Sequence, residues 1–228
     1  MNDFTLTAVI VAAGAGKRLN AGIPKGFLPL GKKPLYQYSL DIFLSHPSVR
    51  DVVIVVPRNK VIETQQSILK MATTKSVFAV AGGKQRWQSV RNGIQATDAD
   101  WVMVHDAARP FVTNAVISSV LEKCMTFDCA ITVTPEVDTI RTMSGELAGE
   151  TLDRSTLVRV GTPQLVRRTL LIEAFKQIPS LPSPPTDEAA LIQQCGVPVA
   201  LAWGDGMNFK ITTPADIAIA EAIIAYRQ

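Results

Sequence analysis

The sequence has few of the residues that enzymes commonly use for acid–base or nucleophilic chemistry. Only two histidines, His46 and His105, occur in 228 residues, and no Ser-His-Asp, Cys-His or H-E-x-x-H arrangement is recognisable. The three cysteines, Cys124, Cys129 and Cys195, form no C-x-x-C pair. We therefore expect them to be reduced core residues rather than metal ligands.

Signals of membrane, secreted, disordered and nucleic-acid-binding proteins are also missing. No apolar run reaches the roughly 18 residues of a membrane span, and no basic segment typical of a signal peptide opens the chain. A hydrophobic content of 47% with 19% charged residues excludes a disordered chain. The net charge of +3 is too small to indicate nucleic-acid binding. We expect a cytoplasmic protein with no membrane or nucleic-acid partner.

Apolar β-rich runs alternate with segments of helical period along the chain. The expected strands are 5–13, 51–56, 76–81, 100–105, 129–134 and 197–203. The expected helices are 34–45, 59–71, 84–96, 113–126, 166–177 and 214–227, and a further helix begins at Thr186-Asp187-Glu188. This alternation predicts an α/β, Rossmann-like fold over 1–228, with a mainly parallel sheet covered by helices on both faces. Because ligands bind beyond the carboxyl ends of such strands, the loops after residues 13, 81 and 105 should converge on one site.

Two stretches break the alternation. Residues 136–163 have β-type residues, a Ser-Gly-Glu turn and no helical period, so we expect a β-arm that projects from the sheet. An exposed arm of this kind needs a partner surface, which makes it a candidate for dimerisation. Residues 178–186 hold four prolines and are expected to form a loop.

The first expected strand runs into a glycine loop that is followed by cations. Gly14 and Gly16 are separated by one residue, and Arg18 and Lys25 follow. This spacing is not that of a Walker loop, and Leu19 stands where a dinucleotide fingerprint requires a third small residue. A strand that ends in such a loop is typical of phosphate binding, and the two cations suit a triphosphate.

Two further segments follow expected strands. In His105-Asp106-Ala107-Ala108-Arg109-Pro110, we expect Asp106 and Arg109 to be functional and His105 to be a satisfied core residue. A carboxylate at a strand end is placed to hold a divalent cation on phosphates or to orient a substrate hydroxyl. In the other segment, Gly82-Gly83 opens a helix, and Ser89 is placed to recognise the edge of a base.

This inventory favours one kind of reaction. Transfer of a nucleotidyl group to an acceptor that is already a phosphate anion needs no general base. It needs cations that collect two polyanions and neutralise the charge that builds on the α-phosphate. The recurring Arg and Lys residues at loop positions fit that requirement.

Several motifs, taken together and in this order, resemble the 2-C-methyl-D-erythritol 4-phosphate cytidylyltransferase family of the non-mevalonate isoprenoid pathway. They are Ala12-Ala13-Gly14-x-Gly16-x-Arg18, Pro24-Lys25, Gly82-Gly83-x-x-Arg86-x-x-Ser89, Val104-His105-Asp106-Ala107-Ala108-Arg109-Pro110, Asp153-Arg154, Thr162-Pro163-Gln164, Thr186-Asp187-Glu188 and Asn208-Phe209-Lys210. The resemblance covers nearly the whole chain.

The resemblance implies a magnesium-dependent transfer from CTP to methylerythritol phosphate in a homodimer. The implied nucleotide-binding residues are Ala12, Ala13, Gly14, Gly16, Gly82, Gly83, Ser89 and Asp106. The implied catalytic residues are Arg18, Lys25, Arg154 and Lys210. The implied acceptor-binding residues are Asp106, Arg109, Thr139, Arg154, Thr162, Thr186 and Lys210. Asp106 would lie near the Mg²⁺ ion on the phosphates, and Thr139 and Arg154, which lie on the arm, would act at the site of the second subunit.

Two positions depart from the family pattern. Gly26 stands where the family commonly has Gln, which could loosen the triphosphate loop, and Lys84 stands where an acid is common. Three alternatives remain: transfer to another polyol phosphate such as ribitol 5-phosphate, a non-catalytic nucleotide-binding module, and a dinucleotide-dependent dehydrogenase. The missing third glycine counts against the dehydrogenase, and the cations at 18, 25, 154 and 210 count against the binding module.

Overall fold

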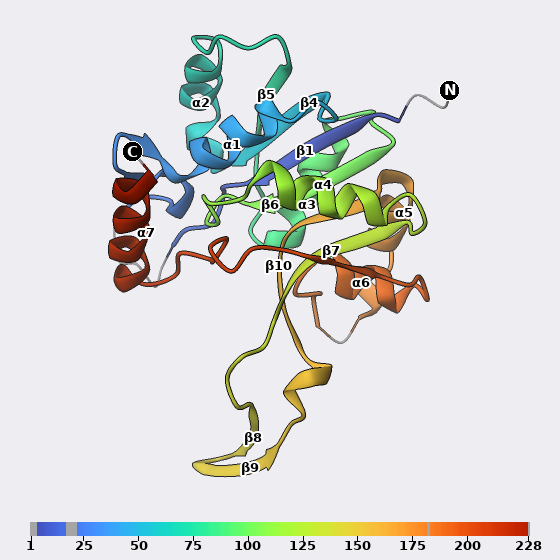
Figure 1. Cartoon of the computed structure of the whole chain (residues 1–228). Coiled ribbons are helices and arrows are strands. Elements are labelled where there is room, and N and C mark those ends of the chain that lie inside the picture. Colours follow the sequence, from blue (N-terminus) through green and yellow to red (C-terminus); the bar gives the residue numbers. More distant parts are fainter. Residues whose placement is uncertain (1–3, 17–21, 182, 228) are drawn as a thin grey trace.

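A seven-stranded sheet in the order β11-β7-β10-β6-β1-β4-β5 forms the centre of the computed structural model, which describes residues 4–16, 22–181 and 183–227 (Figure 1). The strands are β1 (Leu6–Val11), β4 (Asp51–Val56), β5 (Ser76–Ala81), β6 (Trp101–Asp106), β7 (Cys129–Pro135), β10 (Val158–Arg167) and β11 (Ala200–Trp203). Only β10 runs antiparallel to its neighbours, β6 and β7. The expected mainly parallel α/β sheet is confirmed.

Helices cover both faces of this sheet because its strands are apolar on both sides. In β1, for example, Leu6, Ala8 and Ile10 belong to one hydrophobic core and Val9 to the other. The first core is covered by α1 (Leu35–Ser45), α2 (Val61–Ile68) and α4 (Asn114–Lys123). The second is covered by α3 (Arg86–Gln95), α5 (Arg168–Phe175) and α6 (Glu188–Gln194). The last helix, α7 (Pro214–Arg227), contacts the short ribbon of β2 (Pro29–Leu30) and β3 (Lys33–Pro34).

The helix ends follow their local sequence. Thr113 is the N-cap of α4 and accepts a hydrogen bond from the N–H of Val116 at 3.3 Å. Pro214 is the first residue of α7, where its missing N–H costs nothing. The inner face of α3 is buried at Val90 and Ile94, and Trp87 packs against the same core beside Phe175 of α5, with 6.4 Å between the ring centroids.

The segment between β7 and β10 forms a hairpin outside the central sheet. Strands β8 (Arg141–Ser144) and β9 (Leu147–Thr151) pair only with each other, and Figure 1 shows them extending away from the central sheet. The expected range of 136–163 was too long, because β10 already pairs with β7 from Val158 onward. The helix expected over 166–177 is α5, which begins later than expected, at Arg168. A bulge between Val160 and Gln164 shifts the register and interrupts the alternation of side chains along β10, so an alternating pattern does not predict this strand.

Other expectations concern the cysteines, the proline-rich segment and membrane spans. Cys124 and Cys129 are buried and Cys195 is partly buried, all as free thiols, and burial raises the pKa of Cys124 to about 12. The described part of 178–186 holds a single 3-10 turn, Ile178–Ser180, at its start. Across the described residues, no helix combines the length and the apolarity that crossing a membrane requires.

Candidate active site

The loops that follow β1, β5 and β6 meet at the carboxyl edge of the sheet, as expected. They enclose a cavity of about 370 Å³, which we call the strand-end pocket. Its described lining residues are Val11, Ala12, Ala13, Gly14, Ala15, Lys25, Gly26, Gly83, Lys84, Gln85, Arg86, Ser89, Asp106, Ala107, Ala108 and Lys210. The N–H of Lys25 donates to the carbonyl of Gly14 at 3.0 Å, which places that lysine beside the glycine loop. Arg18 lies outside the described residues.

Close packing explains the glycines around this pocket. A Cβ added to Gly82 would lie 2.4 Å from the Cβ of Ala13, so only glycine lets the second loop approach the first. Gly16 has a φ of +65°, a conformation that other residues rarely adopt. Gly26 is buried, and a Cβ there would lie 2.8 Å from the Cβ of Ala12. The loop is therefore tightly packed at Gly26, where the departure from the family pattern suggested slack.

Several backbone amides of these loops already have partners within the protein. The N–H of Ala12 donates to the carbonyl of Val55 at 2.7 Å, and that of Gly82 donates to the carbonyl of Val56 at 2.8 Å. The N–H of Gly83 donates to the hydroxyl of Ser89 at 3.1 Å. These bonds fix the loops against the sheet, so any contact of Ala12 and the glycine pair with a ligand uses other atoms.

Asp106, at the end of β6, is held between two cations. Its Oδ2 accepts from Nζ of Lys210 at 2.6 Å, and its Oδ1 accepts from Nε of Arg86 at 3.1 Å. Burial alone would raise the pKa of Asp106, but the charges of Arg86 and Lys210 outweigh it and hold the pKa below its usual range. Asp106 is therefore a carboxylate at neutral pH.

His105 and Thr162 form a buried hydrogen-bonded chain behind this carboxylate. The hydroxyl of Thr162 accepts from the N–H of Asp106 at 3.1 Å and lies 3.1 Å from Nδ1 of His105. The Nε2 of His105 lies 3.0 Å from the carbonyl of Arg109 and must donate to it, so Nδ1 accepts from Thr162. Burial lowers the pKa of His105 to about 4, which leaves the ring neutral. The interpretation of His105 as a satisfied core residue agrees with this geometry.

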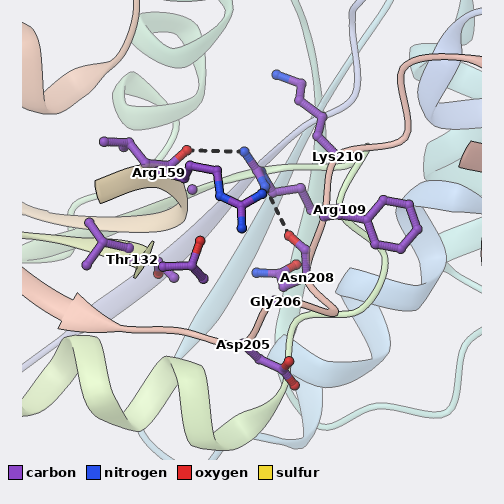
Figure 2. Close-up of a pocket in the computed structure, with 12 residues that line it drawn as sticks. Arg109, Thr132, Arg159, Asp205, Gly206, Asn208 and Lys210 are labelled. Carbon is purple, nitrogen blue, oxygen red and sulfur yellow. Dashed lines mark hydrogen bonds between the residues drawn. The ribbon is translucent and has the colours of Figure 1, made fainter. Parts of the chain in front are cut away.

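A second pocket, of about 400 Å³, adjoins the first and shares Lys210 with it. Figure 2 shows Arg109, Arg159 and Lys210 around it. Arg109 donates to the carbonyls of Asn208 at 3.0 Å and Val160 at 3.4 Å, while its Nε is buried without a hydrogen-bond partner. The second pocket is therefore lined by three cationic side chains and one carboxylate, that of Asp205, and this net positive lining suits an anionic ligand.

Four of the expected acceptor-binding residues lie outside the described linings of both pockets, and one of them is Thr162, whose hydroxyl is buried against His105 and the N–H of Asp106. Thr139 and Arg154 are exposed on the segment that carries the β8–β9 hairpin, and Nη1 of Arg154 donates to the carbonyl of Val137 at 2.8 Å. Thr186 is exposed just before α6. Within one chain, the structure does not bring these side chains to the pockets.

Sequence reasoning missed three charged residues near the site. Arg86 was noted only as part of a motif, and Glu188 only as part of the segment that begins a helix. Glu188 lies in the first turn of α6, and its buried side chain accepts two hydrogen bonds from Arg86, at 2.8 and 3.1 Å. Arg159 gave no signal either, because its strand was assigned to the arm. The helix expected to begin at Thr186-Asp187-Glu188 is α6, and Asp187 is its N-cap and accepts from the N–H of Ala190.

The protein groups at the strand-end pocket suit a cation that is carried mainly by a ligand. Among the described lining residues, Asp106 is the one carboxylate. Over the described parts of the chain, no cluster of three or more His, Cys, Asp or Glu residues could hold a metal ion. Mg²⁺ is commonly bound by one or two carboxylates together with phosphate oxygens and water, so this donor set fits it.

Comparisons with known proteins agree on one family. The family model described as 2-C-methyl-D-erythritol 4-phosphate cytidylyltransferase matches residues 6–226. A relative of that name from Geobacillus thermodenitrificans is 37% identical over 221 residues, covering 96% of this chain and 97% of the relative. One from Halalkalibacterium halodurans is 37% identical over 223 residues, covering 97% and 98%.

Solved structures give the same result. A 2-C-methyl-D-erythritol 4-phosphate cytidylyltransferase from Thermus thermophilus superposes with a TM-score of 0.79 at 31% identity, covering 96% of this chain and 98% of that one. A 4-diphosphocytidyl-2C-methyl-D-erythritol synthase from Anaerococcus prevotii has a TM-score of 0.86 and covers 97% and 96%. Its identity of 22% supports the fold alone.

Proposed function

Because the chain belongs to the 2-C-methyl-D-erythritol 4-phosphate cytidylyltransferase family of nucleotidyltransferases, we propose that it transfers the cytidylyl group of CTP to 2-C-methyl-D-erythritol 4-phosphate. The products are 4-diphosphocytidyl-2-C-methyl-D-erythritol and pyrophosphate. The observation that carries the proposal is the position of Lys210, which lines both the strand-end pocket and the second pocket. A cation shared by two adjoining pockets suits a reaction between two phosphate groups.

CTP occupies the strand-end pocket in this proposal. The triphosphate lies along the glycine loop beside Lys25, with Arg18 as the second cation. Gly83 and Ser89, which line the pocket, lie toward the cytosine together with the adjacent Gly82. The hydroxyl of Ser89 also donates to the carbonyl of Gln85 at 3.3 Å, so Ser89 helps to shape the pocket wall. Lys84 also lines this pocket.

The acceptor phosphate lies between Lys210 and Arg109. One of its oxygens attacks the α-phosphorus of CTP, a new P–O bond forms, and the bond to the β-phosphate oxygen breaks. No proton has to be removed from the nucleophile, and among the described lining residues the one carboxylate, Asp106, already accepts hydrogen bonds from two cations. Lys25 and Lys210 stabilise the charge that develops on the α-phosphate.

Asp106 would hold the Mg²⁺ ion that accompanies the phosphates, directly or through water. When bound, this ion would neutralise phosphate charge and polarise the bond to the leaving group. Both oxygens of Asp106 already accept hydrogen bonds from cations. For Asp106 to bind the metal ion, Lys210 would have to leave Oδ2 or share that oxygen with the ion.

The acceptor site is completed by a second subunit in this proposal. The hairpin carries exposed apolar side chains, among them Met143 at 81% and Leu147 at 75% exposure. Such side chains are suited to burial against a partner. In a homodimer joined through the arm, Thr139 and Arg154 would reach the acceptor pocket of the other subunit.

Product analysis tests the proposal directly. We would incubate the protein with CTP, Mg²⁺ and 2-C-methyl-D-erythritol 4-phosphate and record the phosphorus spectrum of the mixture. The expected result is a new pair of coupled diphosphate resonances together with free pyrophosphate. CTP that persists unchanged with folded, nucleotide-binding protein would contradict the proposed activity.

A further inference from the structure

Arg86 is a charged residue at the strand-end pocket to which the proposed reaction assigns no role. It is the first residue of α3, and it joins two carboxylates that are far apart in the sequence. Its Nη1 and Nη2 donate to the two oxygens of Glu188 at 2.8 and 3.1 Å, and its Nε donates to Oδ1 of Asp106 at 3.1 Å. The guanidinium therefore bridges a buried acid and the carboxylate of the active site.

The position of Glu188 is set by its own helix and the sheet, independently of Arg86. Its side chain is 2% exposed at the start of α6. That end of α6 is attached to β10 by Gln164, whose Nε2 donates to Asp187 at 3.0 Å and whose Oε1 accepts from the N–H of Ala189 at 3.2 Å. Glu188 thus has a position set by the sheet rather than by a mobile surface helix.

The pairing with Glu188 holds the charged guanidinium of Arg86 in place and fixes its orientation. A buried carboxylate without a partner is strongly destabilising, so Glu188 retains the guanidinium. The two parallel hydrogen bonds fix the plane of the guanidinium, because both partners are planar. Once that plane is fixed, the direction of the Nε–H bond is fixed too, and it points at Oδ1 of Asp106.

We propose that Arg86, anchored by Glu188, is a positioning residue that holds the carboxylate of Asp106 in place for the transfer. The inference rests on the proposed function, since it assigns Arg86 to the same site. Arg86 acts through Asp106, whereas Lys25 and Lys210 act on the phosphates. Its own charge is largely balanced by Glu188, so it serves little as a free cation for the triphosphate.

Conservative variants test this role without unfolding the protein. Arg86→Ala would leave Glu188 buried and unpaired, so we choose Glu188→Gln, which removes the anchor, and Arg86→Lys, which cannot bridge two carboxylates. We expect kcat to fall on the order of 10²-fold in both, as for a misplaced active-site group, with KM for CTP nearly unchanged. Asp51→Asn is the matched control, because it removes a partly buried carboxylate from its pair with Arg50 at the opposite end of the sheet.

A double variant separates positioning from a general structural effect. If Arg86 acts through Asp106, then Glu188→Gln should slow Asp106→Asn no further, because the group being positioned is already lost. Additive losses in the double variant would overturn the proposal. So would a KM for CTP that rises while kcat holds, which is the sign of direct binding of the triphosphate by Arg86.

A crystal structure of Glu188→Gln answers the same question without turnover. We expect the guanidinium of Arg86 to leave Oδ1 of Asp106 in that variant, and an unchanged Arg86–Asp106 contact would overturn the proposal. An inactive wild-type protein would count against the proposed function alone, because this structural comparison still decides the role of Arg86.

Discussion

The Nζ of Lys210 lies 2.6 Å from Oδ2 of Asp106, although the two residues are 104 positions apart in the chain. This contact brings the segment before α7 onto the carboxyl end of β6. It places a cation at the boundary of the two pockets, where the α-phosphate and the acceptor phosphate would meet in the proposed reaction.

Replacing Lys210 should therefore affect the transfer more than the fold. We expect Lys210→Met to lower kcat by about 10²–10³-fold, the usual effect of removing one stabiliser of transition-state charge. The folded state should persist, because Asp106 keeps its bond to Arg86. Steady-state kinetics and thermal unfolding measure the two effects. Lys176→Met, which removes a surface lysine from its pair with Glu173, is the control and should keep full activity.

Replacing Lys25 should likewise lower activity more than stability. It lines the strand-end pocket next to the glycine loop, and we expect Lys25→Ala to reduce kcat by about 10²–10³-fold with a small change in melting temperature. The exposed Lys32, which lies outside that pocket, provides the comparison as Lys32→Ala. Equal losses of activity and stability in Lys25→Ala would mean that Lys25 supports the fold rather than the reaction.

Asp216 should make stability depend on pH. The N–H groups of Thr212 and Thr213 each donate to its Oδ2 at 2.7 Å, and these bonds, that of Thr212 foremost, lower the pKa of Asp216 to about 2. A depressed pKa stabilises the fold above the unfolded value of about 3.9, and this contribution is lost as pH falls toward 2.

We therefore expect Asp216→Asn to destabilise the protein by about 1 kcal/mol at pH 7, as for the loss of a helix cap. The difference from wild type should shrink below pH 4 in urea unfolding followed at a series of pH values. Glu221→Gln, at an exposed position of the same helix, should show no such trend. A difference that stays constant with pH would show that the carboxylate charge is not responsible.

The hairpin should decide the oligomeric state. Because Met143 and Leu147 are exposed in one chain, we expect Met143→Asp with Leu147→Asp to convert a dimer into a monomer in sedimentation velocity. Activity should be lost together with the dimer, because Thr139 and Arg154 would act from the partner subunit in the proposed homodimer. Met125→Asp changes an exposed methionine outside the arm and should leave the dimer intact. A fully active monomeric wild type would contradict this part of the account.

Local sequence was enough for most of the fold. The six expected strands and the convergence of three loops at their carboxyl ends correspond to β1, β4, β5, β6, β7 and β11 and to the strand-end pocket. What local sequence did not reveal was β10. Its alternation is interrupted where the register shifts at Gly161, Thr162 and Pro163, and its antiparallel direction depends on where the hairpin returns to the sheet.

The same limit applies to the site. The loop motifs identified Asp106 and Lys25, because each lies in a segment with a recognisable pattern, and the family resemblance identified Lys210. The Arg86–Glu188 pair joins residues 102 positions apart, and no pattern in either segment indicates the other residue as its partner. Thr162 was expected to reach the acceptor, whereas its hydroxyl is buried against His105 and the N–H of Asp106. Such partners follow from the three-dimensional packing of β6, β10 and α6.

The most direct test of the central claim is pyrophosphate release with CTP and Mg²⁺, with 2-C-methyl-D-erythritol 4-phosphate and ribitol 5-phosphate supplied in parallel. We expect release with methylerythritol phosphate and none with ribitol phosphate. Release with ribitol phosphate alone would keep the chemistry and replace the acceptor. No release with either, from folded protein that binds CTP, would contradict the account and leave a nucleotide-binding protein without transferase activity.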